Sequence, residues 1–392
     1  MTNHCTKSLR STSLGAIAFA ASTFAMLCAT GISLHAREAA KSPVAYIYVS
    51  SSSASGTEQI NAYAAEPNGK LTPVPGSPFA ENGAYLTVDK KWLFSSDTVN
   101  VYSFSIAANG ALKQVSSINA QQLNGYSDGG PVNLFLDRTG ETLYDEDIYG
   151  NNGANNTYQF FGVNQSTGAL SFLGATTSAS PEFETPLSFV GSNVAGYGSS
   201  CYHGFQNIYG FSRSGNGSLT DLNLNPSIPA AATGGYCPYL ATSDKMNNVA
   251  ISLTPTEDGM TVIGPTQLGV YTAESSGNLT TTSTYENMPK VGAGSLNAMV
   301  ASPSGKLLAV AGSKGLQIFH FNGANPITHY TYLLTADSIS QIFWDNDNHL
   351  YAISQSAGKL YVFTVTPVSF GKAPGSPYAI TSPEFIAVLP RM

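Results

Sequence analysis

The chain has 392 residues, of which only 10% are charged, and its 24 acidic residues outnumber its 17 basic ones. Such a composition lacks the basic patch of a nucleic-acid-binding protein or of a protein that binds anionic lipid. Its 38 Gly, 21 Pro and 21 Tyr residues indicate many short strands joined by tight turns.

The first 36 residues have the layout of a secretory signal peptide. Lys7 and Arg10 precede a weakly hydrophobic apolar run over residues 14–34, and the small residue Ala36 lies just before a polar segment. An uncleaved membrane anchor is the alternative, because about 20 apolar residues can span a bilayer. Gly, Ser, Thr and Ala are frequent in the run, which favours the cleaved signal.

Cleavage after the leader leaves residues 37–392, which we expect to form one domain. The leader holds two of the 17 basic residues and none of the acidic ones, so the net charge of the remainder is −9. We expect a periplasmic or secreted monomer that binds neither nucleic acid nor membrane.

One pattern recurs along the chain: an alternating strand with an aromatic residue, a short polar stretch, and Gly-x-Leu opening the next strand. Seven copies end at Leu71, Leu112, Leu170, Leu219, Leu279, Ile327 and, in degenerate form, Phe370. The mean spacing of the first six is about 51 residues, the length of a four-stranded propeller blade. A β-sandwich with coincidental turns is the less economical alternative.

The two ends of this array are complementary. Residues 45–49 begin with a second-strand pattern, so the first blade lacks an inner strand, and residues 383–389 are an inner strand without a blade. Pairing them closes the ring and removes exposed edges. The sequence therefore predicts an all-β, seven-bladed β-propeller with four-stranded blades, closed by its C-terminal strand.

Two further motifs add a family resemblance. Residues 302–308 read Ser-Pro-Ser-Gly-Lys-Leu-Leu, and Pro-Gly-Ser-Pro followed by an aromatic residue occurs at both 75–79 and 374–378. With the repeats, these make residues 44–390 resemble the lactonase (6-phosphogluconolactonase-like) β-propeller family, including its exported bacterial members. The resemblance implies the scaffold and lactone hydrolysis, but a scaffold hosts many functions.

Long connections are expected to gather on one face of the ring, where functional pockets of propellers usually open. They are residues 119–131, 145–157, 176–186, 199–207, 223–238, 253–267 and 284–296.

An acidic run, Asp145-Glu146-Asp147, opens one of these expected loops. Two of its carboxylates can ligate a hard cation such as Ca²⁺, or Glu146 or Asp147 can act as a general base. A solvated acidic loop is the default interpretation. No other cofactor is required by any motif in the sequence.

His203 is the only histidine on the expected pocket face, so we take it as the first candidate for acid–base catalysis. A surface histidine that only forms hydrogen bonds is the alternative. Six further residues on this face are candidates for ligand contact: Tyr126, Asp128, Tyr149, Glu182, Glu184 and Tyr236.

Cys201 and Cys237 are the only cysteines beyond the leader, and an even pair in an exported chain favours a disulfide. We expect Cys201 at the end of a second strand and Cys237 in the loop that enters the next blade.

A phosphorylated sugar lactone needs Arg or Lys residues at the site. Arg138 and Arg213 map away from the expected pocket face, and only Lys290 and Lys314 approach it. This favours a neutral, sugar-type lactone that is hydrolysed or at least bound. The rival hypothesis is a non-catalytic propeller that binds a protein or glycan at the cell envelope.

Overall fold

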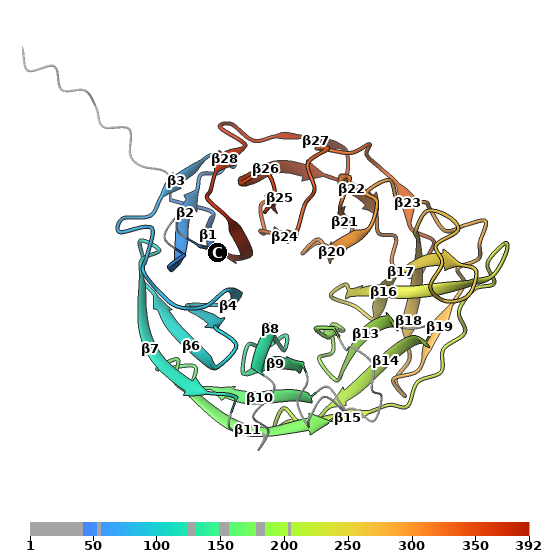
Figure 1. Ribbon diagram of the computed structural model, residues 1–392, viewed down its shortest axis with the longest axis horizontal. Coiled ribbons are helices and arrows are strands. Elements are labelled where there is room, and N and C mark those ends of the chain that lie inside the picture. The colour runs from blue at the N-terminus through green and yellow to red at the C-terminus, as the bar shows by residue number, and fades with distance from the viewer. Residues whose placement is uncertain are drawn as a thin grey trace, which may run out of the picture. The chain divides into compact units, whose positions relative to one another are not determined.

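The computed structural model describes residues 42–52, 56–121, 123, 130–148, 157–177, 185–202 and 205–391. In these ranges every regular element is a β-strand, and the strands form seven sheets. Figure 1 shows the sheets as blades around a central axis, with β4, β8, β16, β20 and β24 near the centre and β7, β11, β23 and β27 at the rim.

Each blade runs from an inner strand near the axis to an outer strand at the rim. From inner to outer strand, blade 1 contains β29 (Pro383–Pro390), β1 (Ala45–Ser52), β2 (Glu58–Ala65) and β3 (Leu71–Pro73). Blade 2 contains β4 (Tyr85–Asp89), β5 (Trp92–Ser96), β6 (Asn100–Ile106) and β7 (Leu112–Asn119). Blade 3 contains β8 (Gly130–Leu136), β9 (Thr142–Ile148), β10 (Thr157–Val163) and β11 (Leu170–Thr177). Blade 4 contains β12 (Ser188–Phe189), β13 (Ala195–Tyr202), β14 (Phe205–Arg213) and β15 (Leu219–Asp221).

The remaining blades follow the same order. Blade 5 contains β16 (Gly235–Ser243), β17 (Asn248–Thr256), β18 (Gln267–Ala273) and β19 (Leu279–Thr281). Blade 6 contains β20 (Leu296–Ala301), β21 (Leu307–Gly312), β22 (Gly315–His320) and β23 (Thr328–His329). Blade 7 contains β24 (Gln341–Trp344), β25 (His349–Ser354), β26 (Lys359–Thr366) and β27 (Ser369–Lys372), and β28 (Tyr378–Ala379) also pairs with β26.

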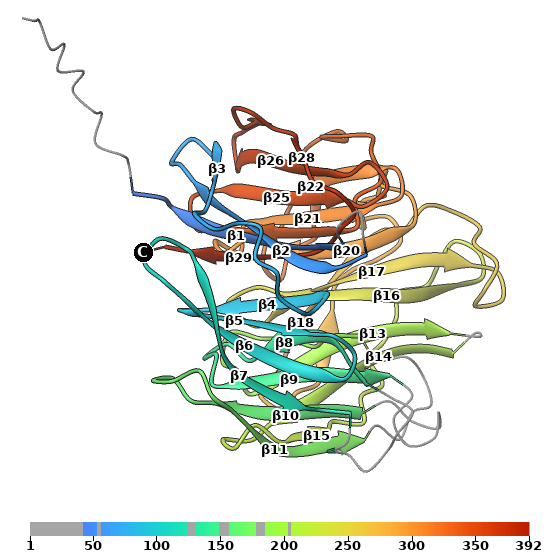
Figure 2. The ribbon, with the colours of Figure 1, turned by 60° about the vertical axis from the view of Figure 1, so that its left-hand side comes forward.

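The predicted ring closure is confirmed. β29 pairs with β1 in antiparallel register from Ala45 opposite Pro390 to Val49 opposite Ile386. Figure 2 shows these first and last strands side by side. Blade 1 is therefore assembled from both ends of the array, so no inner edge is left unpaired there.

The glycines of three Gly-x-Leu repeats also take part in the packing of neighbouring blades. Gly110 and Gly217 have φ values of 86° and 90°, in the left-handed region that favours glycine. The Tyr48 hydroxyl of blade 1 donates to the Gly110 carbonyl at 2.9 Å, and the Tyr144 hydroxyl of blade 3 donates to the Gly217 carbonyl at 2.7 Å. The glycine thus shapes a turn, and its carbonyl oxygen accepts a hydrogen bond from a tyrosine hydroxyl of the preceding blade.

The hydrophobic core is divided among the interfaces between neighbouring blades. Between blades 3 and 4, aromatic side chains dominate: Phe135 stacks on Tyr144 with ring centroids 5.2 Å apart, and Tyr158 meets Phe211 edge-on at 5.5 Å. Large flat side chains on every second position of a strand suit this face-to-face packing of twisted sheets.

Two faces of the ring carry the connections. We call the side with the links between second and third strands, and between blades, the loop face, and the opposite side the turn face. The expected loop at 199–207 is corrected: β13 and β14 extend through most of it, and only residues 203–204 separate them. Strands are longer here because the hairpin pairs up to Tyr202 opposite Phe205.

Candidate functional site

The acidic run lies in a strand and not in a loop. β9 continues to Ile148 and is paired with β8 on one side and β10 on the other, which corrects the loop expected from residue 145 onward. Asp145 is 0% exposed and Glu146 is 2% exposed. The default interpretation of a solvated acidic loop is therefore wrong for these two residues, because their side chains point to opposite faces of β9 and both faces are buried at this position.

Glu146 is held by an amide from the neighbouring inner strand. β8 has a bulge between Val132 and Phe135, where Asn133 adopts a φ of 48°. From there the Asn133 Nδ2 donates to Glu146 Oε2 at 2.9 Å. Burial raises the pKa of Glu146 to about 8, and the hydrogen bond from Asn133 opposes this rise. The carboxyl is consequently mostly protonated at neutral pH, with an ionised minority.

A second carboxyl group approaches the same region from blade 1. Burial raises the pKa of Tyr85 in β4, and the charges of Glu384 in β29 and of Glu146 raise it further. The Ser52 hydroxyl donates to Glu384 Oε1 at 2.6 Å, and the Tyr85 ring lies 4.6 Å from that of Phe385. Ionisable groups from blades 1, 2 and 3 thus share one electrostatic environment.

Most other candidates lie where the structure gives no description. Tyr126, Asp128, Tyr149, Glu182, Glu184 and His203 are outside the described residues, as is the side chain of Asp147. Their proposed roles stay predictions.

Tyr236 is described, and it lies in the core of blade 5. It is 1% exposed, and its hydroxyl donates to Gln267 Oε1 at 2.5 Å. Burial raises the pKa of Tyr236 to about 12. The structure therefore gives this side chain a packing role.

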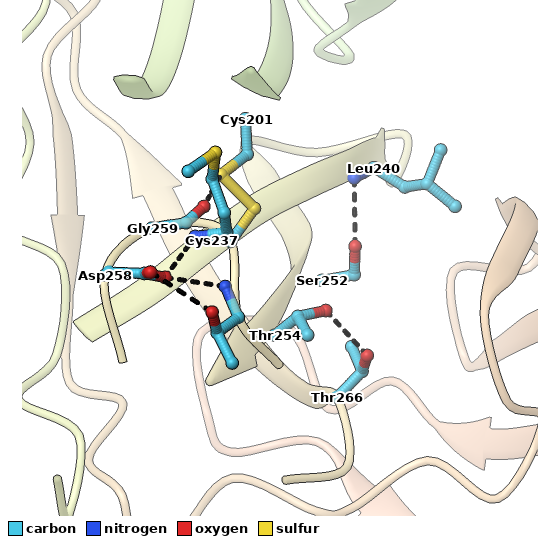
Figure 3. Close-up of a disulfide and its surroundings, with 10 residues drawn as sticks. Cys201, Cys237, Leu240, Ser252, Thr254, Asp258, Gly259 and Thr266 are labelled. Atoms are coloured by element: carbon cyan, nitrogen blue, oxygen red, sulfur yellow. Dashed lines mark hydrogen bonds between the residues drawn. A yellow bond between two sulfur atoms is a disulfide. The ribbon is translucent and has the colours of Figure 1, made fainter. Parts of the chain in front are cut away.

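Cys201 and Cys237 are joined by a disulfide between blades 4 and 5 (Figure 3). Cys201 is near the end of β13, as expected, but Cys237 lies within β16 and not in the loop before it, since β16 already starts at Gly235. Figure 3 also shows Asp258 at the loop beside the bridge, where its carboxylate accepts hydrogen bonds from the amides of Met260 and Thr261. The bridge fixes this part of the loop face.

A cavity of about 810 Å³ opens beside the disulfide, between blades 5 and 6. Its lining includes Cys237, several serine and threonine hydroxyls, Asn297, the partly exposed Tyr239 and Lys314. Of the two lysines expected near the pocket face, Lys314 lines this cavity and Lys290 lines a neighbouring hollow of about 590 Å³. Neither carboxylates nor histidines are among its described lining residues, so the lining offers hydroxyl and amide contacts and the charge of Lys314.

The two arginines that a phosphate would require are engaged elsewhere. Arg213 Nη2 lies 3.0 Å from the Asp137 carboxylate, with the two side chains 10% and 0% exposed. Arg138 donates to main-chain carbonyls of blades 4 and 5, including Phe189 at 2.7 Å. Both lie at the turn-face end of their blades and link neighbouring sheets.

Asn133 and Tyr239 are contributors that sequence reasoning missed. Each lies at a β-bulge of an inner strand, β8 and β16 respectively. A bulge changes which side chains of a strand face the neighbouring strand or blade. The residues of an alternating segment give little indication of where such a bulge occurs. The one weak signal in the sequence is that residue 133 is an asparagine, which adopts a left-handed backbone more readily than most other non-glycine residues.

The expected Ca²⁺ site stays a prediction. In the parts of the chain that the structure describes, no three His, Cys, Asp or Glu side chains are grouped as metal ligands. Within the same ranges, no helix is long and apolar enough to cross a membrane.

The strand pairing defines a seven-bladed β-propeller closed by its last strand, and its fold is similar to that of 6-phosphogluconolactonase-like propellers. Among solved structures, the chain is similar to a periplasmic gluconolactonase of Pseudomonas aeruginosa, with 15% identity, a TM-score of 0.64, and coverage of 88% of this chain and 99% of that one. A putative 6-phosphogluconolactonase from Bacteroides uniformis is 13% identical, with a TM-score of 0.63 and coverage of 88% of this chain and 99% of that one. Another from Bacteroides fragilis is 14% identical, with a TM-score of 0.58 and coverage of 88% of this chain and 98% of that one. Likeness at such identities shows the fold alone. No family model and no curated protein matches the chain.

Proposed function

We propose that the protein is an exported lactonase that hydrolyses a neutral, sugar-derived lactone, with Glu146 as its proton-transfer residue. The observation that carries the proposal is the buried Glu146 carboxyl with its pKa raised to about 8 and oriented by Asn133. A general base works best when its pKa is near the working pH. The fold shared with a periplasmic gluconolactonase supports the choice of reaction.

In the proposed reaction the ionised form of Glu146 takes a proton from a water molecule. The water oxygen attacks the lactone carbonyl carbon, the ring carbon–oxygen bond breaks, and Glu146 returns the proton to the departing ring oxygen. The product is the open-chain hydroxy acid. Asn133 is a positioning residue, because it acts on the substrate only through Glu146.

A neutral substrate is favoured because the two arginines that could bind a phosphate group have other partners in the structure. Arg213 is paired with Asp137 and Arg138 bonds to carbonyls at the turn-face end of the blades, so neither is available for a phosphate at the loop face. Export is supported by the leader over residues 1–36 and by the disulfide, which suits an oxidising compartment. We propose the periplasm or the cell exterior as the location.

The test is a panel of aldonolactones, starting with glucono-1,5-lactone, assayed with the wild type, Glu146→Gln and the exposed control Glu141→Gln. We expect Glu146→Gln to lower kcat/KM at least about 100-fold and the control to have little effect. After subtraction of spontaneous hydrolysis, kcat/KM of the wild type should rise with pH through an apparent pKa of about 8. A parallel series with EDTA tests the Ca²⁺ prediction.

Two results would overturn the assignment. Absence of turnover on every lactone removes the enzymatic function. Turnover that survives Glu146→Gln but is lost in His203→Ala transfers the acid–base role to His203.

Non-catalytic glycan binding is the second candidate, and the cavity beside the disulfide favours it. Hydroxyl groups, one amide and the 47% exposed Tyr239 are the groups that neutral sugars contact, and no acid–base residue is among the described lining. Under this hypothesis the wild type binds a glycan without altering it. Tyr239→Ala should weaken binding, and Glu146→Gln should leave it unchanged. If the ligand is instead a protein of the cell envelope, that protein should bind the propeller, and free sugars should not compete with it.

A further inference from the structure

A separate cavity of about 670 Å³ lies on the turn face. Four inner strands reach it with their last residues: Leu136 of β8, Phe189 of β12, Ser243 of β16 and Ala301 of β20. These positions come just before the turns between first and second strands, so the cavity lies at the end of the central axis opposite the loop face. It is distinct from the site of the proposed lactonase reaction.

Arg138 lines this cavity and has unused hydrogen-bonding capacity. Its Nε donates to the carbonyl of Phe189 at 2.7 Å and its Nη2 donates to the hydroxyl of Ser243 at 3.1 Å and to the carbonyl of Asp244. Within the described residues, Nη1 makes no hydrogen bond and no carboxylate lies within ion-pair distance of the guanidinium. Neutral oxygens therefore supply the direct hydrogen bonds of Arg138, and the charge of the Asp244 carboxylate acts on it without a direct ion pair.

Lys245 supplies a second unpaired positive charge to the same cavity. It is exposed on the turn after β16, and its ammonium group has neither a hydrogen bond nor an ion pair in the described part of the chain. In a protein with an acidic balance, two such charges in one hollow are a local exception.

Two acids lie near this pair, and neither forms a direct ion pair with Arg138 or Lys245, although the charge of Asp244 acts on Arg138. The Asp244 carboxylate accepts hydrogen bonds from the main-chain amides of Met246 and Asn248 at 2.8 Å and 3.1 Å, within its own turn. Asp137, next to Arg138 in the chain, is paired with Arg213. Serine hydroxyls at Ser188 and Ser243 and apolar surfaces complete the walls.

We propose that this cavity binds a small organic oxyanion, whose carboxylate or phosphate group lies between Arg138 and Lys245. Arg and Lys are the side chains that recognise these groups through charge-assisted hydrogen bonds. The carbon part of the ligand lies against Leu187, Phe189 and Val300, and its hydroxyl groups meet the serine side chains. The proposal does not depend on lactone hydrolysis, because it concerns the opposite face of the ring.

The experiment is calorimetric titration of the mature chain carrying Glu146→Gln, which keeps catalysis out of the measurement. The probes are gluconate, the uncharged glucitol of equal chain length, and inorganic phosphate, each at low and at high salt. Variants are Lys245→Glu, Arg138→Gln with its folding checked by circular dichroism, and Lys306→Glu as control. Lys306 is an exposed lysine of the next blade's turn that does not line the cavity.

Gluconate or phosphate should bind while glucitol does not, and salt should weaken the binding. Lys245→Glu should weaken it at least about tenfold, since a repulsive charge replaces an attractive one, and Lys306→Glu should change it less than twofold. A preference for gluconate over phosphate identifies a carboxylate ligand, and the reverse identifies a phosphate ligand. Equal binding of gluconate and glucitol, no binding of either anion, or anion binding unchanged by Lys245→Glu would overturn the proposal.

Discussion

The Asn133 amide reaches the Glu146 carboxyl because the backbone of β8 departs from regular pairing. The bulge turns Asn133 into a left-handed conformation, from which its Nδ2 lies 2.9 Å from Glu146 Oε2. Glu146 is only 2% exposed, and among the described side chains the neutral Asn133 amide is its single hydrogen-bond partner. An ionised carboxylate in such surroundings is destabilised, since it has lost its hydration.

Stability should therefore depend on the titration of Glu146. Its pKa is raised from 4.5 in the unfolded chain to about 8 in the folded protein, so the folded state holds the proton longer and unfolding becomes easier as pH rises through this interval. Each pKa unit corresponds to about 1.4 kcal/mol. We expect the free energy of unfolding in urea to fall by a few kcal/mol from pH 5 to pH 8. Glu146→Gln should remove most of this slope, and Glu141→Gln should retain it.

Deleting residues 383–392 should destabilise the whole ring. Ala387 and Val388 of β29 are buried between blades 1, 2 and 7, and the strand covers the inner edge of β1. Its loss exposes this apolar surface and a long strand edge. Thermal unfolding should shift to a markedly lower temperature, whereas deletion of Met392 alone should not shift it. An unchanged unfolding temperature of the longer deletion would contradict ring closure as a source of stability.

The disulfide should stabilise the fold against unfolding. Cys201 and Cys237 are 36 residues apart in the chain, and closing a loop of this length contributes about 3 to 4 kcal/mol by the loop-entropy relation. The double variant Cys201→Ser/Cys237→Ser should unfold at lower denaturant concentration than the oxidised wild type, and the reduced wild type should resemble it. Thiol titration of the unfolded, unreduced protein should find no free thiols, and the detection of two would rule the bridge out in solution.

The Arg213–Asp137 pair should stabilise the contact between blades 3 and 4. Burial raises the pKa of Asp137, but hydrogen bonds from Thr139, Thr142 and Asn193 and the charge of Arg213 outweigh it, so the pKa lies below its usual value. Removing Arg213 leaves a buried carboxylate without its counter-charge, so Arg213→Met should cost about 3 kcal/mol. The loss should shrink as Asp137 becomes protonated at acid pH. In a double-mutant cycle with Asp137→Asn, additive effects would show that the two residues do not interact.

The blade pattern was readable in the sequence because it depends on short-range chemistry. Leu71, Leu112, Leu170, Leu219 and Leu279 each begin an outer strand, since a glycine turn and alternating apolar residues act within a few positions of each other. The pairing of residues 383–390 with the first strand was also predictable, because one end of the array lacked the strand that the other end had in excess.

The site was less predictable, for reasons seen at Glu146 and Tyr236. The acidic run is typical of a solvated loop, because three carboxylates in succession are usually solvated. Only the pairing of β9 on both sides shows that Glu146 lies in a sheet, where burial raises its pKa and the bulge in β8 brings the Asn133 amide to it. Tyr236 lies next to a cysteine of the loop face, yet the alternation of β16 turns it into the core.

By itself, the sequence determined the number of blades, their strand order and the closure of the ring, since these follow from local turn chemistry and strand periodicity repeated seven times. The tertiary structure alone decided which polar side chains are buried and which positive charges lack a partner. Charge pairing depends on residues from different blades, such as Arg138 of blade 3 with Ser243 of blade 5, and no spacing along the chain encodes the distance between sheets. The contact of Asn133 with Glu146 depends on a strand bulge, which the spacing of residues does not encode either.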